Sequence, residues 1–134
     1  MRLKGVCYDV GRHMGFNWRP NFDLNVVHRE LEIINKDLHC NGVRICGQSI
    51  ERLMLATKDA LEQGLEVWLS PEMWDKSPED TLAYMIKAAE AAEDLRKNSK
   101  GNLVLSVGSE LTLFMRGIVE GKELVARIWR VRAL

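Results

Sequence analysis

Strand-type and helix-type segments alternate four times along this chain of 134 residues, and no other sequence feature limits the possible folds as strongly. The expected strands cover residues 5–10, 42–46, 65–70 and 103–107. The expected helices cover residues 24–38, 49–63, 77–97, 111–119 and 122–133. Strands that are separated by helical crossovers pair in parallel. We therefore predict an α/β protein of four βα units with a parallel sheet, and we expect residues 1–134 to form a single domain.

Capping residues mark where the expected helices begin and end. Asp23, Ser49 and Ser77 each precede a helical pattern and offer a side-chain oxygen to the free N–H groups of the first turn. Pro78 occupies a first helical position, which tolerates a residue without an N–H group. Gly64 predicts the end of the second helix, because glycine readily adopts the left-handed conformation that follows a helix.

The two faces of the expected strands differ in composition. Because side chains alternate between the faces of a strand, residues of one parity share a face. One face collects Val6, Tyr8, Val43, Ile45, Val67, Leu69, Leu103, Leu105 and Val107. The other face collects Cys7, Asp9, Arg44, Cys46, Trp68, Ser70, Glu72, Val104, Ser106, Gly108 and Glu110. The first set is almost wholly aliphatic, whereas the second mixes small, polar and charged groups.

This asymmetry bears on two architectures. A doubly wound sheet carries helices on both faces, and both faces should be apolar because buried charge without a partner is costly. In a TIM (β/α)8 barrel one strand face points inward and carries the polar groups of the mouth. A complete barrel needs about 250 residues, so we favour half of such a barrel, either truncated or self-associating. A small open-sheet signalling domain is the alternative, and it predicts helices on both sheet faces.

Balanced charge and short apolar runs exclude several classes of partner. The chain carries 19 basic and 19 acidic residues, so it lacks the surplus of Lys and Arg with which proteins neutralise phosphates. No apolar run approaches the roughly 20 residues of a membrane-spanning helix, and no secretory apolar region follows the N-terminus. We therefore expect a cytoplasmic protein with neither a nucleic acid nor a membrane as partner.

No motif predicts a cofactor or a metal site. The sequence contains no GxGxxG, GxxxxGK(S/T) or GxSxG pattern, which are typical of nucleotide binding and of serine hydrolases. The three histidines show no HxxxH or HExxH spacing. Cys7, Cys40 and Cys46 are odd in number and lack CxxC spacing, so we expect free buried thiols.

Ionisable residues follow the expected strands at their carboxyl ends, where parallel α/β folds hold their working groups. These positions carry Asp9 with Arg12 and His13, then Arg44, Glu72 and Glu110. A carboxyl group in a half-buried pocket has a raised pKa and can act as a general acid. A neighbouring arginine can orient a substrate or a second carboxylate.

Each charged candidate also has a structural interpretation. Glu110 is either a catalytic carboxyl group or a first-turn glutamate that the helix dipole stabilises. Arg44 either forms an ion pair with Asp9 or Glu72, or clamps a substrate. Glu72 also fits a loop carboxylate beside an aromatic residue, and His13 fits a solvated surface residue.

Two tryptophans lie in loops that lead from a strand to a helix, at the same expected end of the sheet. Sugar-binding proteins place flat apolar platforms at such positions, so Trp18 and Trp74 are candidate carbohydrate contacts. Packing in the protein core is the competing interpretation for both.

Two segments resemble motifs of the retaining glycoside hydrolase clan that is built on (β/α)8 barrels. Residues 41–45, Asn-Gly-Val-Arg-Ile, resemble its second-strand Asn-x-Val-Arg motif, and residues 107–111, Val-Gly-Ser-Glu-Leu, resemble its fourth-strand Gly-Asn-Glu motif. This resemblance implies that Glu110 is the acid/base and that Arg44 lies near the nucleophile. The stretch 108–121 is also similar to uncharacterised microbial barrel proteins labelled abortive infection proteins.

Two departures from the clan limit what the resemblance implies. Ser109 stands where the clan has the asparagine that bonds the sugar 2-hydroxyl. The clan's nucleophile ends strand seven, whereas this chain has four expected strands, and retaining hydrolysis needs two carboxyl groups about 5 Å apart. We therefore expect a hydrolase-like fragment that is completed by a homodimer or by a complementary half-barrel. The alternative is a non-catalytic module that binds carbohydrate or protein.

Overall fold

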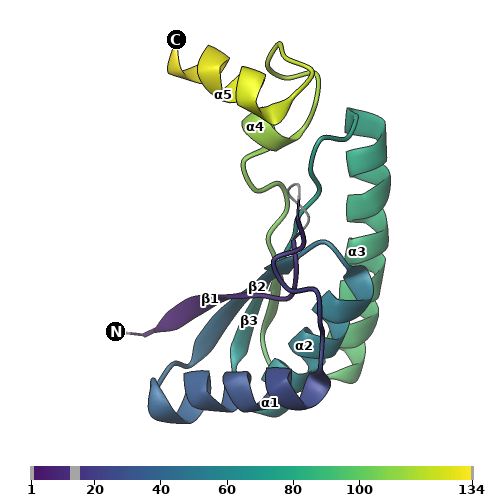
Figure 1. The fold of residues 1–134 in the computed structure, drawn as a ribbon. Helices are drawn as coiled ribbons and strands as arrows, with labels where there is room; N and C mark the ends of the chain where they lie inside the picture. The colour runs from purple at the N-terminus through teal and green to yellow at the C-terminus, as the bar shows by residue number, and fades with distance from the viewer. Residues whose placement is uncertain (1, 13–15, 134) are drawn as a thin grey trace.

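The computed structural model describes residues 2–12 and 16–133, and strands and helices alternate in it until two helices follow the last strand. In chain order they are β1 (Gly5–Asp9), α1 (Leu24–Glu32), the π-helical turn η1 (Ile33–Asp37), β2 (Gly42–Gly47), α2 (Ile50–Glu62), β3 (Glu66–Pro71), α3 (Pro78–Asn98), β4 (Leu103–Leu105), α4 (Leu111–Phe114) and α5 (Leu124–Arg132). Figure 1 traces this order from the N-terminus to the C-terminus.

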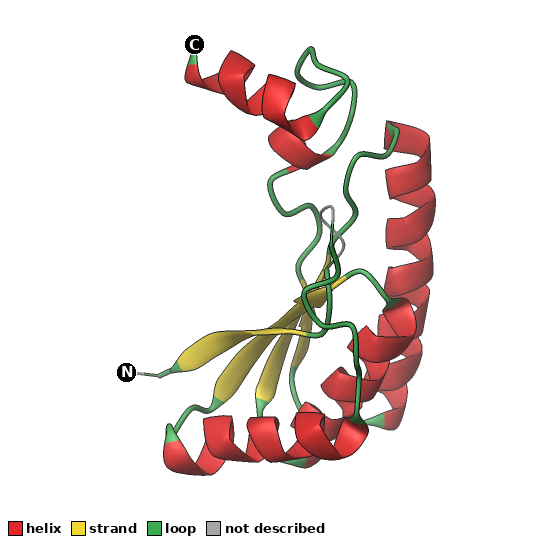
Figure 2. Ribbon diagram, viewed as in Figure 1, coloured by secondary structure: helices red, strands yellow, loops and turns green. Residues whose placement is uncertain are grey.

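The four strands form one parallel sheet in the order β1-β2-β3-β4. Each strand therefore lies beside the strand that precedes it in the chain, and a helix makes every crossover between them (Figure 2). The prediction of an α/β protein with a parallel sheet is confirmed. The expected N-caps are confirmed as well, since Asp23, Ser49 and Ser77 each accept a hydrogen bond from a backbone N–H group of the following helix.

One face of the sheet is packed beneath α1, α2 and α3 and forms the protein core. The strand residues predicted for this face are buried through the two central strands, where Val43, Ile45, Val67 and Leu69 expose at most 1% of their surface. From the helices, Val27, Leu31, Leu53, Ala56 and Ala60 complete the same cluster. Burial of apolar surface holds the helices on this face.

The opposite face has no helix over it within the described residues. Trp68 and Val104 lie on this face with 42% and 38% of their surface exposed. Cys7 is exposed beside them, so the prediction that all three cysteines are buried is wrong at this position. The parity of the strand residues predicted the face correctly, but Cys7, Trp68 and Val104 stay exposed because no helix of the described residues covers the middle of this face. The thiols are free, as predicted.

The fourth βα unit differs most from the prediction. Strand β4 ends at Leu105, and Gly108 in the segment that follows has a φ of +82°. The expected helix 111–119 ends at Phe114, and Gly117 with a φ of +94° lies beyond it. Val107, assigned by parity to the covered face, follows the end of β4 and is 62% exposed.

Helices α4 and α5 lie beyond the carboxyl ends of the strands, apart from the layer of α1 to α3 (Figure 1). The fully buried Arg127 of α5 holds them there. Its guanidinium forms an ion pair with Asp75 in the loop after β3, and its Nε donates to the carbonyl of Leu113 over 2.6 Å. A backbone bridge between Lys76 and Met115 also joins the loop after β3 to the end of α4.

Candidate functional site

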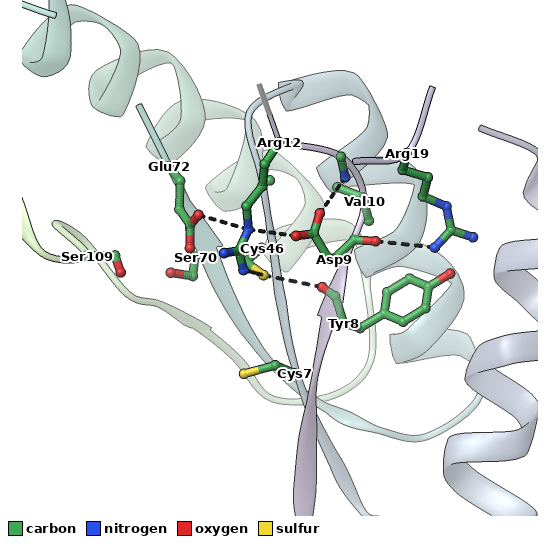
Figure 3. A network of polar contacts seen from close by, with 12 residues as sticks. Cys7, Tyr8, Asp9, Val10, Arg12, Arg19, Cys46, Ser70, Glu72 and Ser109 are labelled. Atoms are coloured by element: carbon green, nitrogen blue, oxygen red, sulfur yellow. Dashed lines mark hydrogen bonds and ion pairs between the residues drawn. The ribbon is translucent and has the colours of Figure 1, made fainter. Parts of the chain in front are cut away.

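Polar side chains from all four strands, or from the loops that follow them, meet at the carboxyl end of the sheet. This strand-end cluster consists of Asp9, Arg12, Arg44, Cys46, Ser70, Glu72 and Ser109. Figure 3 shows most of these side chains pointing toward one another from β1, β2, β3 and the loops that follow β1 and β3. Ser109 lies at the left of the view, beyond Ser70 and Glu72. The structure thus brings together Asp9, Arg44, Glu72 and Ser109, four residues that the sequence singled out separately.

Arg12 lies at the centre of the cluster. Its Nε is 2.6 Å from Asp9 Oδ2 and 3.2 Å from Glu72 Oε2, and its Nη2 donates to Cys46 Sγ over 2.9 Å. These contacts link β1, β2 and β3 through one guanidinium. The sequence placed Arg12 near Asp9 but did not indicate that it joins the two carboxylates, because Glu72 is 60 residues further along the chain.

Arg44 has fewer short contacts than Arg12. Its Nη2 donates to Ser70 Oγ over 2.8 Å and lies 3.4 Å from both Glu72 Oε1 and Ser109 Oγ. The ion pair with Glu72 confirms one of the partners expected for Arg44. Its Nη1 lies 3.8 Å from Cys7 Sγ, and the side chain is 36% exposed.

Glu72 is the buried carboxyl group of the cluster, with 7% of its side chain exposed. Burial raises the pKa of this carboxyl group above its usual range because it removes water from the charged form. Arg12 and Arg44 act in the opposite direction, whereas Asp9 and Glu110 add to the rise. A buried carboxyl group with a raised pKa keeps its proton to a higher pH than an exposed one and is therefore a candidate general acid.

Glu110 is an exposed residue at the start of α4. Its backbone has a left-handed conformation with a φ of +48°, and its carbonyl accepts hydrogen bonds from Leu113 and Phe114. The side chain caps no backbone N–H group of α4. Glu110 is nevertheless close enough to influence the carboxyl group of Glu72 electrostatically. The structure therefore places it at the rim of the cluster.

Trp18 lies beside the strand-end cluster with 60% of its surface exposed. It stacks on Phe16 with 4.9 Å between the ring centroids. Together with Asp9 and Arg19 it lines a pocket of about 220 Å³. Arg19 fixes this loop, because its Nη1 donates to the carbonyl of Asp9 over 3.2 Å. An exposed aromatic residue thus adjoins a carboxylate of the cluster.

Trp74 has a different setting. Its ring packs against Phe114 of α4 with 3.8 Å between the centroids, so it helps to attach α4 to the loop after β3. The indole Nε1 is buried and has no hydrogen-bond partner among the described residues. The structure therefore gives Trp74 a packing contact, while its assignment as a carbohydrate contact stays a prediction.

The remaining predictions concern His13, a metal site and a membrane-spanning helix. His13 lies outside the described residues. Within residues 2–12 and 16–133, no group of three or more His, Cys, Asp or Glu side chains could hold a metal ion. No helix in that part of the chain is long and apolar enough to cross a membrane.

Comparison with known proteins adds no family, because neither a family model nor a curated protein matches the chain. The resemblance to glycoside hydrolases therefore rests on the two short motifs that carry Arg44 and Glu110.

Proposed function

We propose that the strand-end cluster is one half of a glycoside hydrolase-like site and that it binds a carbohydrate. The observation that carries this proposal is the convergence of polar side chains from β1, β2, β3 and the segments that follow β1, β3 and β4, at the end of the sheet face that α1 to α3 leave uncovered. In (β/α)8 barrels the corresponding strand ends hold the working groups. The chain would then be a (β/α)4 half-barrel.

The chemistry of the cluster suits a ligand with many hydroxyl groups. Hydroxyls both donate and accept hydrogen bonds. Asp9 supplies acceptor oxygens, Arg44 supplies N–H donors, and Ser109 can act in either direction. The exposed ring of Trp18 beside Asp9 offers an apolar surface to the C–H face of a sugar ring.

Hydrolysis is the second candidate, and the raised pKa of the buried Glu72 favours it. In the glycosidase resemblance the acid/base is Glu110 and the nucleophile belongs to strand seven. A complete retaining site needs that second carboxyl group about 5 Å from the first. The missing wall would come from a second copy of the chain or from a complementary half-barrel, and the chain by itself is then a binding module.

Carbohydrate binding is tested with a glycan array, followed by calorimetric titration of the glycans that bind. Arg44→Met removes hydrogen bonds from a charged donor and should weaken binding about tenfold or more. Trp18→Ala should weaken it as well. Arg96→Met and Trp129→Ala are the matched controls, because both residues are exposed on helices away from the cluster. If no glycan binds, the proposal fails and a protein-interaction role takes its place.

Hydrolysis is tested with aryl glycosides. Activity that disappears in Glu110→Gln and falls in Glu72→Gln would support an enzyme, and Glu66→Gln, at the opposite end of β3, is the control. Glycan binding that survives Glu110→Gln without any turnover would support the binding module.

A further inference from the structure

A row of side chains crosses the middle of the uncovered sheet face. The strand register aligns Cys7 with Arg44, Arg44 with Trp68, and Trp68 with Val104. We call this row the open-face row. A parallel sheet rarely leaves one of its faces to water, because an uncovered face keeps apolar surface in contact with solvent.

The open-face row forms a hollow with apolar walls. A pocket of about 350 Å³ lies over it, lined among others by Leu3, Val6, Cys7, Arg44 and Trp68. Leu3 is 38% exposed, in addition to Trp68 and Val104 within the row itself. Apolar side chains from β3, β4 and the segment before β1 are thus available to a partner.

The total exposed area is large for a chain of this mass. A folded monomer of 15.3 kDa is expected to expose about 7,100 Å². This chain exposes 8423 Å². The excess of about 1,300 Å² is comparable with the area that each partner buries in a stable homodimer.

The edges of the sheet suit a second copy of the same sheet. Strands β1 and β4 are the two edge strands, and each pairs with one neighbour among the described residues. A half-turn about an axis along the strands brings β4 of each copy beside β1 of the other, with all strands still parallel. The four strands of each copy then close one eight-stranded barrel, in which no strand edge is left exposed.

The charge of the chain also permits association with itself. Its formal net charge is zero, so two copies carry no net repulsion. The cluster at the strand ends already pairs Arg12 and Arg44 with Asp9 and Glu72 inside one copy. A symmetric contact therefore does not bury an excess of one charge.

From these observations we infer that a second copy of this chain covers the open-face row and closes an eight-stranded barrel around the strand-end cluster. The inference rests on the half-barrel of the proposed function and names the partner that completes its site. In this dimer Trp68 of each copy lies in the interior, and each cluster gains an opposite wall from the other copy's strand ends.

The experiment measures mass by light scattering after size exclusion, and sedimentation equilibrium, on the full chain at micromolar concentration. The wild type should be a dimer. Trp68→Glu should be a monomer because it places a charge in the barrel interior. Trp129→Glu is the control on α5, where the tryptophan is 64% exposed, and it should stay dimeric. Val104→Lys, in the same row as Trp68, repeats the test if Trp68→Glu does not fold.

A second measurement reports on the face itself. Cys7 lies in the open-face row, whereas Cys40 and Cys46 are buried within one copy. The Cys7 thiol should react with a disulfide reagent roughly tenfold or more faster in Trp68→Glu than in the dimer. A wild-type monomer, a dimer that persists in both row variants, or a dimer that Trp129→Glu dissociates would overturn the inference. A dimer that binds no glycan leaves the inference standing and overturns the proposed function, whereas a monomer that binds glycan does the reverse.

Discussion

The two faces of the same sheet carry residues that are neighbours in the chain but have opposite surroundings. Leu69 is fully buried beneath the helices, while Trp68, one residue earlier, is 42% exposed on the other face. The covered face holds the core together, and the uncovered face holds the strand-end cluster. One set of strands can thus separate stability from chemistry, because adjacent side chains along a strand point to opposite faces.

The separation has an energetic reason. Burial of apolar surface contributes about 25 cal/mol per Å², so the aliphatic face gains most when helices cover it. Covering Arg44 and Asp9 with an apolar helix would remove water from charged groups and would cost free energy. The same sheet therefore favours helices over its aliphatic face, and a ligand or partner with polar groups at the strand ends of the other face.

Leu69→Ala should produce the largest effect on this comparison. Removing a fully buried leucine side chain leaves a cavity, and we expect the free energy of unfolding to fall by about 2–5 kcal/mol. Val104→Ala, on the uncovered face, should change it by about 0.5 kcal/mol or less. Urea unfolding at low chain concentration, where association does not contribute, measures both. Equal losses for the two variants would contradict the division between the faces.

Arg12→Met tests whether polar contacts also stabilise the uncovered side. The variant removes the guanidinium that joins Asp9, Glu72 and Cys46, and we expect a loss of about 1.5–3 kcal/mol in the free energy of unfolding. Arg44→Met is the matched variant, because Arg44 makes one short hydrogen bond and should cost about 1 kcal/mol or less. The reverse order of the two losses would show that Arg44, and not Arg12, holds the cluster together.

Glu72→Gln should have the smallest effect, visible as a change in pH dependence. Burial raises the pKa of Glu72, so the folded chain binds this proton more tightly than the unfolded chain does. The resulting stabilisation is complete below the unfolded pKa of about 4.3 and is lost as the pH rises through the raised pKa. Thermal unfolding from pH 4 upward should therefore show the variant gaining stability relative to the wild type as the pH rises.

Glu66→Gln is the control for this titration and should behave in the opposite way. Hydrogen bonds from Trp68 and Asn102 lower the pKa of Glu66. Its stabilisation is present above the unfolded pKa and is lost as the pH falls through the lowered value. Glu66→Gln should therefore lose stability relative to the wild type as the pH rises from the acid range. The same direction in both variants would contradict the assignment of a raised pKa to Glu72.

Local sequence patterns predicted much of the fold and part of the candidate site. Capping by Ser49 and Ser77 follows from contacts within one helical turn, and the burial of Ile45 and Val67 follows from alternation along a strand. The parallel order of the strands predicted that Asp9 and Glu72 would share one end of the sheet. These features depend on short separations along the chain or on the order of the elements.

Features that depend on contacts between distant segments were not predictable in the same way. The buried Arg127 meets Asp75, 52 residues away, and this contact places α5 beyond the strand ends and not beside α3. No period or motif in residues 122–133 indicates that contact. Cys7 has the apolar neighbours of a buried residue in the sequence, yet it is exposed because no helix covers its face.

Strand alternation and helical period are local, so the four βα units, the parallel sheet and the contrast between an aliphatic and a mixed strand face are predictable from the sequence. The folded arrangement was needed to see that Glu72 is the buried carboxyl group, that Arg12 joins it to Asp9, and that Glu110 lies at the rim. Burial and charge pairing depend on three-dimensional distance, which packing sets between residues far apart in the chain.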